Sequence, residues 1–507
     1  MFEHVLSVMI FLPLLAGAAL LLLPISKSGV RAFGLVVSVV VLICGLKVYV
    51  DFSGSGGLEF VEKISWVPSF GIAYHVGVDG ISLFVLMVAA VLFPMVFMLF
   101  AEKSKNYYCN LLIALGAMVG AVVAADLVVF YVFWEVMLLP IFFVIGLYGG
   151  EQRIAATIKI TLYTIAGSLL MLAGLLYIAV AHHAQTGQWS FEIARMASLD
   201  LGGGFAVAAF IGMMLAFAIK IPLFPFHTWL PDAYTEAPTS TTFILSAIMA
   251  KIGVYGVIRF VVPVFEAEMA RFAVILAYCG VIGLMYCGIA AIVQKDFKRM
   301  LAFSSASHMG IIALGVFCMN VQALTGTLFQ IVAHATSTGV LFLFAGILEE
   351  RCQTRKIADL GGVAAKAPIF ATFFAIAMLA SCGLPGTSGF IGEFLIILGA
   401  VKFNIVIGVL AGTTLIIGVC YMLWMFQRVF FEQSTAKTAG FKDLSAYETL
   451  VFIPVILLIL FMGIYPQPFI DKIEPAAQRQ ILQMATTTQP QLAGDMESAY
   501  TLELINN

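Results

Sequence analysis

Apolar runs of about 20 residues, the length that a helix needs to cross a hydrocarbon core of about 30 Å, follow one another along almost the whole chain. Of the 507 residues, 62% are hydrophobic and only 11% are charged, a proportion too apolar for a soluble fold to bury. The sequence therefore predicts an all-α polytopic membrane protein without a soluble domain. We expect about fourteen spans, near residues 3–23, 30–50, 78–100, 107–125, 126–148, 155–180, 204–230, 240–262, 270–293, 300–318, 323–347, 368–400, 403–427 and 447–465.

Two of these spans, the seventh and the twelfth, are interrupted. The seventh contains Pro222, Pro225 and Pro231, and the twelfth contains Pro385 among four glycines in the stretch GLPGTSGFIGEF. Proline removes a backbone donor and clashes with the preceding turn, and non-helical backbone at membrane depth persists only where protein or water satisfies it. A kink made for packing could explain either break alone. Two breaks in separate halves favour a transporter built from repeats, with sites at the breaks.

The positions of the two breaks also predict how the repeats are arranged. Five helices separate equivalent spans, an odd number that would invert the second copy relative to the first. The expected segments are residues 1–106 with helices 1–3, residues 107–262 as a first five-helix repeat, residues 270–432 as a second, inverted repeat, residues 447–465 as helix 14, and residues 466–507 as a polar C-terminal tail.

Several functional classes lack support in the sequence. The net charge is −2, and no basic tract indicates nucleic-acid binding. The eight cysteines form no CxxC pair and are typical of small buried hydrophobic residues. No HxxxH or HExxH spacing indicates a metal site, so we expect no cofactor in this chain. The first residues lack the features of a signal or transit peptide and predict a retained first helix.

The distribution of Lys and Arg predicts the orientation, because inner loops of membrane proteins carry an excess of both. With the N-terminus outside, fifteen fall in inner loops and eight in outer flanks, so both termini should face outward. The fifteen are Lys27, Arg31, Lys103, Lys105, Arg153, Lys295, Lys298, Arg299, Arg351, Arg355, Lys356, Lys366, Arg428, Lys437 and Lys442. The eight are Lys47, Lys63, Arg195, Arg259, Arg271, Lys402, Lys472 and Arg479.

Charged residues at membrane depth are rare and usually functional. Glu135 follows Asp126 by nine residues, about 14 Å along a helix, which places it near the middle of the bilayer. Lys251 lies about eleven residues into its span, and Lys220 precedes the Pro222 break. Burial favours the neutral form of such groups and a nearby opposite charge favours the charged form, so movement of a partner can switch proton binding. Glu135 could instead be a protonated residue bonded to a neighbouring helix.

Lys159 is a fourth candidate, although it lies only a few residues inside the sixth span. From that position its long side chain can reach the membrane interface. An interfacial anchor and a functional lysine therefore remain equally open interpretations.

Two later spans have polar faces that could continue a proton path. They carry Ser304 and His308 one turn apart, and then Gln330, His334 and Thr338 on a single helix face. Histidine titrates near neutrality and can pass protons from either ring nitrogen. Each histidine alone would be a satisfied core group, but in series with Lys251 and Glu393 the two favour a relay.

Five motifs together resemble a known family. In chain order they are FWEVMLLPIFFVIGLYG, KIPLFPFHTWLPDAYTEAPTSTT, IMAKIGVYGVIRF, QKDFKRMLAFSSASHMG and GLPGTSGFIGEF. The chain resembles the antiporter-like subunits of respiratory NADH–quinone oxidoreductase (complex I), which are related to the Mrp-type sodium–proton antiporters. The resemblance covers roughly residues 75–465.

The resemblance implies roles for individual residues. The family's helix-five glutamate falls on Glu135, its broken-helix lysine on Lys220, its central lysine on Lys251 and its helix-eleven histidine on His334. Sibling subunits usually carry lysine on the second broken helix, where this chain has Glu393. That departure resembles the M-type subunit, the bacterial counterpart of mitochondrial subunit four.

The same resemblance implies a function and a location. Quinone reduction would occur elsewhere in the complex, with FMN, iron–sulfur clusters and quinone in other subunits. In this chain Glu135 would set the proton affinity of Lys220, and protons would pass through Lys251 and the His308/His334 region to Glu393. The neighbours would be L-type and N-type subunits in a bacterial inner membrane, with both termini in the periplasm.

Three alternatives remain open at this point. A stand-alone or Mrp-type cation–proton antiporter would be favoured by lysine at position 393, which is glutamate here. A membrane subunit of a proton-pumping hydrogenase or formate hydrogenlyase shares much of the motif set. A structural scaffold would not need so many buried charges.

Overall fold

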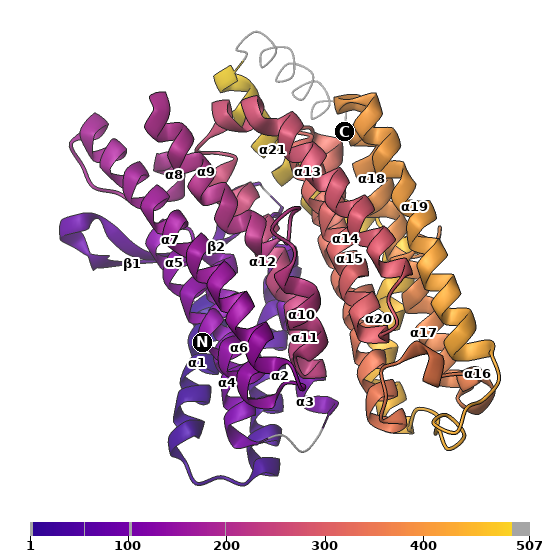
Figure 1. The fold of residues 1–507 in the computed structure, drawn as a ribbon. Coiled ribbons are helices and arrows are strands. Elements are labelled where there is room, and N and C mark those ends of the chain that lie inside the picture. The colour runs from indigo at the N-terminus through magenta and orange to yellow at the C-terminus, as the bar shows by residue number, and fades with distance from the viewer. Residues whose placement is uncertain (1–3, 55, 101–103, 198, 489–507) are drawn as a thin grey trace.

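The helices of the chain run side by side in one bundle (Figure 1). The computed structural model describes residues 4–54, 56–100, 104–197 and 199–488. Within these residues, twelve helices are long and apolar enough to cross a membrane, which confirms the all-α multi-pass class. Two further apolar helices, Ser82–Met98 and Pro368–Ser381, are shorter, so the count of fourteen spans stays a prediction.

The elements follow the predicted spans closely along the chain. Those of the first half are α1 (Val5–Leu22), α2 (Lys27–Asp51), β1 (Glu59–Val67), β2 (Ile72–Val78), α3 (Ser82–Met98), α4 (Lys105–Val123), α5 (Leu127–Val136), α6 (Leu138–Tyr148), α7 (Arg153–Thr186), α8 (Ile193–Met196), α9 (Gly203–Lys220), α10 (Trp229–Glu236), α11 (Thr239–Ile244) and α12 (Ala250–Gly256). Those of the second half are α13 (Glu266–Ile292), α14 (Phe297–Phe317), α15 (Val321–Cys352), α16 (Val363–Lys366), α17 (Pro368–Ser381), α18 (Ser388–Phe403), α19 (Ile405–Phe426), α20 (Ala446–Ile464) and α21 (Gln467–Thr488).

The centre of the bundle is formed by α14 and α15, which lie between α10–α12 on one side and α18–α19 on the other (Figure 1). The most apolar stretch of α15 is buried at every residue, and that of α14 is 94% buried. In α1, α7, α13 and α20 only 33% to 44% of the equivalent stretch is buried. The remaining residues of these stretches expose apolar side chains. The central helices are therefore the ones that can carry polar groups shielded from lipid.

The break in the seventh predicted span is confirmed. The helix α9 ends at Lys220, and α10 begins only at Trp229. Pro222 and Pro225 lie between them, where neither can donate a backbone hydrogen bond. The Trp229 indole Nε1 donates to the Ile219 carbonyl at 2.8 Å, so a side chain satisfies backbone that the break leaves free.

The break in the twelfth span is also confirmed, and its glycines have a steric cause. The helix α17 ends at Ser381 and α18 begins at Ser388. Gly383 has φ of +69°, a left-handed conformation that glycine adopts without penalty. A Cβ at Gly389 would lie 1.9 Å from the Ala380 carbonyl oxygen. The glycines therefore let α18 start directly against the end of α17.

The fifth predicted span, 126–148, matches the candidate span Leu127–Tyr148, but its helix is interrupted. It consists of α5 and α6, which are separated at Met137. Pro140 in the first turn of α6 cannot donate to the carbonyl four residues earlier, which explains the interruption.

Two polar segments form more structure than the sequence indicated. Residues in the expected 51–77 loop form the antiparallel hairpin β1–β2. The expected polar tail, 466–507, begins with α21, which packs against α13 and α15. The rest of that tail, 489–507, lies outside the described residues, as does Lys103 of the orientation count.

Replacing Gly389 with alanine should destabilise the second break. The added Cβ would overlap the Ala380 carbonyl oxygen at 1.9 Å, and overpacking of this kind costs about 1–3 kcal/mol. The midpoint of thermal unfolding of the full chain in detergent should fall. Gly412→Ala in α19 is the matched control, because no heavy atom lies within 4 Å of its Cβ position and alanine favours a helix by about 0.5–1 kcal/mol. Equal midpoints for the two variants would contradict this explanation.

Candidate functional site

Lys251 and His334 form a buried polar contact between α12 and α15. Both side chains are at most 1% exposed. The Lys251 ammonium donates to the Ser246 carbonyl oxygen, which lies in the π-helical turn Leu245–Met249, and it lies 2.6 Å from His334 Nδ1. An ammonium only donates hydrogen bonds, so charged Lys251 requires a lone pair on His334 Nδ1. The His334 proton is then on Nε2, which has no hydrogen-bond partner among the described residues.

His308 on α14 lies next to His334. Its ring centroid lies 5.4 Å from that of His334. Both of its nitrogens lie 2.8 Å from backbone carbonyl oxygens, Nδ1 from Ser304 and Nε2 from Ser381. Carbonyl oxygens only accept, and a neutral imidazole has one N–H. The pair of acceptors is therefore fully satisfied only when His308 carries a second proton.

Glu393 on α18 lies beside His308 and close to the second break. Its Oε1 lies 3.5 Å from His308 Nε2 and accepts a 3.1 Å hydrogen bond from Gln330 Nε2. A Cβ at Gly383 would lie 2.8 Å from Glu393 Oε2, so that glycine allows the carboxylate to approach the unwound backbone. The break also supplies Ser381, whose carbonyl oxygen faces His308.

The predicted residues Lys251, His334, His308 and Glu393 thus come together in one buried line across four helices. Sequence reasoning missed one neighbour of this line. The Tyr421 hydroxyl on α19 lies 2.8 Å from the Ser304 hydroxyl and is completely enclosed. A tyrosine within the apolar run GVCYMLWMF carries no charge or proline signal that would have identified it.

Lys220 and Glu135 form a second group beside the first break. Lys220 is 2% exposed, and its Nζ lies 5.2 Å from the centroid of the Trp134 ring, a distance at which a cation is attracted to the ring face. Glu135 interacts with Lys220 electrostatically, although no ion pair within 4.0 Å joins them in the described part of the chain. Glu135 Oε1 is buried without a hydrogen-bond partner.

The helices that carry the two groups pack together, because α12 lies directly against the end of α9. A Cβ at Gly253 would lie 3.1 Å from the Cβ of Lys220. Gly253 follows Lys251 by two residues on the same helix. Gly253 therefore allows the end of α9 to pack closely against the helix that carries Lys251.

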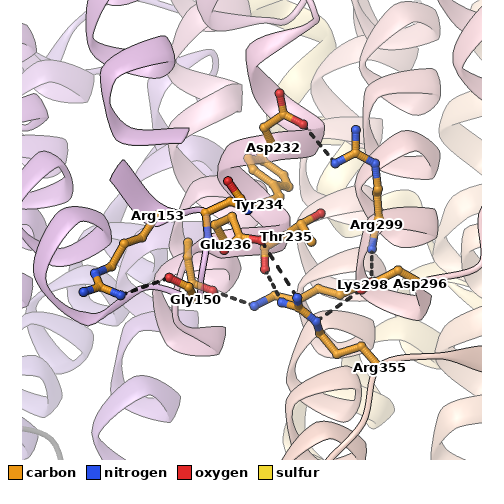
Figure 2. Close-up of polar contacts among 12 residues, drawn as sticks. Gly150, Arg153, Asp232, Tyr234, Thr235, Glu236, Asp296, Lys298, Arg299 and Arg355 are labelled. Atoms are coloured by element: carbon orange, nitrogen blue, oxygen red, sulfur yellow. Dashed lines mark hydrogen bonds and ion pairs between the residues drawn. The ribbon is translucent and has the colours of Figure 1, made fainter. Parts of the chain in front are cut away.

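Lys159 lies apart from the buried residues. Its Nζ donates to Asp232 Oδ2 at 2.8 Å, and its side chain is 36% exposed. The other carboxylate oxygen of Asp232 accepts from Arg299 at 2.9 Å, and Figure 2 shows the two side chains pointing toward each other. Asp232 is a second residue that sequence reasoning missed, because it follows Pro231 in what looked like a span end.

A wider set of charges surrounds this contact and joins α10 to the start of α14 and to the segment that follows α15 (Figure 2). The Arg355 guanidinium lies 3.2 Å from Asp296 and 3.9 Å from Glu236, and it donates to the Thr235 carbonyl at 2.7 Å. The buried Lys298 Nζ donates to the Ala237 carbonyl at 2.6 Å. A cavity of about 460 Å³ opens beside Lys298, Glu236 and Arg355. Among the described residues, no group of three or more His, Cys, Asp or Glu could hold a metal ion.

Comparison with known proteins places this geometry in context. The model of the NADH:quinone oxidoreductase/Mrp antiporter transmembrane family matches residues 124–418. NADH-quinone oxidoreductase subunit M of Rickettsia bellii is 38% identical over 481 residues, which cover 92% of this chain and 96% of that protein. NADH-ubiquinone oxidoreductase chain 4 of Marchantia polymorpha is 35% identical over 474 residues, covering 92% and 94%.

Solved structures agree with these matches. A chain of respiratory complex I from Thermus thermophilus superposes with a TM-score of 0.85 at 32% identity, covering 96% of this chain and 100% of that one. A chain of the Mrp complex from Dietzia sp. DQ12-45-1b gives a TM-score of 0.83 at 21% identity, covering 96% and 98%, a likeness of fold.

The Lys251–His334 contact predicts non-additive effects on stability. Lys251→Met leaves both nitrogens of His334 unbonded, and His334→Leu leaves the ammonium with only the Ser246 carbonyl. Each single variant should lose about 1–3 kcal/mol of stability, whereas the double variant should lose clearly less than the sum.

Thermal unfolding of the purified protein in detergent measures this coupling. The control combines His334→Leu with Lys402→Met, because Lys402 is exposed near the end of α18 and should contribute additively. Additive losses for Lys251→Met and His334→Leu would show that the contact does not couple the two helices.

Proposed function

Because this chain belongs to the NADH:quinone oxidoreductase/Mrp antiporter transmembrane family, we propose that it is the M-type, proton-translocating membrane subunit of a respiratory NADH–quinone oxidoreductase. The similarity to curated M subunits extends over 92% of the chain. Glu393 at the second break, where sibling subunits usually carry lysine, supports the same assignment.

The observation that carries the proposed mechanism is the contiguous line from Lys251 through His334 and His308 to Glu393. Each member can bind and release a proton, and neighbouring members are in contact or close to it. Changes in the distance between Glu135 and Lys220 would alter how firmly Lys220 holds its proton, and a proton displaced from Lys220 would pass to Lys251. The line would then carry it toward Glu393.

The two breaks would belong to two inverted five-helix repeats, residues 107–262 and 270–432. Lys159 would act chiefly as an anchor for Asp232, since it is partly exposed and lies apart from the line. The ion pairs that join α10 to the start of α14 and to the segment after α15 would hold α10, the second part of the first broken helix, in place.

The chain would work only within its complex. Quinone, FMN and iron–sulfur clusters would be bound by other subunits, and NADH oxidation would drive this subunit through conformational coupling. L-type and N-type subunits would lie on either side of it in a bacterial inner membrane. Both termini would face the periplasm, as the Lys and Arg distribution indicates.

An Mrp-type antiporter subunit is the second candidate, because the Dietzia Mrp chain shares the fold. Sodium-dependent proton exchange by this chain in the absence of NADH would favour that candidate. The relatives that are 38% identical to this chain are named as subunits of NADH-quinone oxidoreductase, which favours the first candidate function.

Lys220→Ala should lower proton pumping by the assembled complex. The substitution removes the buried charge that Glu135 acts on, so NADH oxidation would no longer move protons through this subunit. The measurement is NADH-driven acidification of proteoliposomes, divided by the rate of NADH oxidation. We expect this ratio to fall by roughly a third or more, as it would if one of several parallel proton paths were lost. Lys402→Gln removes an exposed lysine and should leave the ratio unchanged. A ratio in Lys220→Ala equal to that of the wild type would overturn the proposed role.

A further inference from the structure

A second cavity, of about 320 Å³, lies at the end of the bundle formed by the β1–β2 hairpin, α8 and α21. Its lining includes His75, Asp79, Glu192 and Arg259. Burial lowers the pKa of His75, which lies in β2 outside the spans. The charged side chains that border the cavity are Asp79, Glu192, Arg259 and Arg479.

The inner part of this cavity reaches a shielded ion pair. Arg259 Nη1 lies 2.7 Å from Asp79 Oδ2, and the two side chains are only 13% and 9% exposed. The other oxygen of Asp79 accepts from the backbone N–H groups of Ile81 and Ser82 at 3.1 and 3.0 Å. Asp79 is thus fixed to the start of α3, and it holds the guanidinium in one place.

Arg259 connects this ion pair to the helix that carries Lys251. Its Nε donates to the Tyr255 hydroxyl oxygen at 3.2 Å, and Tyr255 is completely buried. Lys251 and Tyr255 lie four residues apart in α12, which puts them on one face with a rise of about 6 Å. From the cavity inward, the Asp79–Arg259 pair is followed by the Tyr255 hydroxyl. Lys251 lies one helical turn further along α12, with its Nζ at the Ser246 carbonyl.

We propose that this cavity is a second opening of the proton path, that the Asp79–Arg259 ion pair seals it, and that the Tyr255 hydroxyl links it to Lys251. The proposal rests on the proposed function of Lys251 as a proton carrier. It adds an aqueous connection in the first half of the chain, separate from the one expected at Glu393.

The chemistry of the seal follows from the contacts. A hydroxyl conducts a proton by accepting one on a lone pair while it donates its own to the next acceptor. The Arg259 Nε–H occupies a lone pair of the Tyr255 oxygen, and the guanidinium charge repels a proton approaching from either side. Asp79 neutralises that charge and keeps the guanidinium over the hydroxyl. While the ion pair is intact, Lys251 is therefore isolated from the cavity.

Passive proton leakage tests this proposal. The complete complex is reconstituted into vesicles that contain a pH-sensitive dye, and a potassium diffusion potential drives protons in the absence of NADH. Arg259→Gln removes the charge and the Nε donor, and Asp79→Asn loosens the guanidinium with a side chain of the same shape. Both should raise proton permeability at least threefold, while NADH oxidation in detergent, which reports assembly, should stay within twofold of the wild type.

Control variants identify the path of the leak. Lys63→Gln breaks an exposed ion pair with Glu192 at the same end and should not leak, and Arg259→Lys keeps the charge and should remain tight. Adding Tyr255→Phe or Lys251→Ala to Arg259→Gln should abolish the leak. Tight vesicles with both Arg259→Gln and Asp79→Asn, or a leak that survives Lys251→Ala, would overturn the proposal.

The leak experiment is independent of the pumping experiment. If Lys220→Ala pumped normally, the proposed function would fail, but the leak through Arg259→Gln could still be measured without NADH. If pumping failed in Lys220→Ala and no leak occurred in the Arg259 variant, only the second opening would be wrong.

Discussion

The structure holds the Lys251 amine in the middle of an apolar bundle, where a charged ammonium needs close partners. Moving such an ion from water into a medium of low dielectric constant costs several kcal/mol even after relaxation. Lys251 offsets this cost with the Ser246 carbonyl and His334 Nδ1, and both partners require an unusual local structure. Ser246 lies in a π-helical turn, a feature frequent at functional sites. His334 lies on α15, whose most apolar stretch is buried at every residue, so the contact with Lys251 is shielded from lipid.

The charged side chains of this chain differ in how many close partners they have. Those around α10 form several direct ion pairs, in which Arg355, Asp232 and Arg299 each have close partners. Within the part of the chain that the structure describes, Lys220 and Glu135 have no such direct pair, and one oxygen of Glu135 has no hydrogen-bond partner. Groups that are held by many contacts change little when a neighbour moves, whereas a loosely held pair responds strongly. The sparsely bonded pair is therefore suited to switching, and the densely bonded charges are suited to holding the broken helix.

The sequence allowed the breaks and the buried charges to be predicted, because both depend on local chemistry. Pro222 and Pro385 interrupt a helix whatever surrounds them, and Lys220 or Glu393 is costly in lipid wherever it lies. The contacts depend on tertiary packing and could not be predicted. Arg259 illustrates the difference, since its position near a span end indicated an outer flank, yet it lies in a shielded pair with Asp79, 180 residues away. The apolar sequence around Tyr421 did not indicate its contact with Ser304. The β1–β2 hairpin lies in a polar segment that was expected to be a loop.

A proton that passed through His334 would change the tautomer of the ring, which would then have to return to its starting form. A proton that arrives at Nδ1 from Lys251 and leaves from Nε2 converts the ring to the Nδ1–H form, which cannot accept from the ammonium again. Before the next proton, the ring must rotate or the hydrogen must return to Nε2. Nε2 has no hydrogen-bond partner among the described residues, so no hydrogen bond on that side resists rotation. If His334 carries protons as proposed, each passage would therefore be followed by a step that resets the ring.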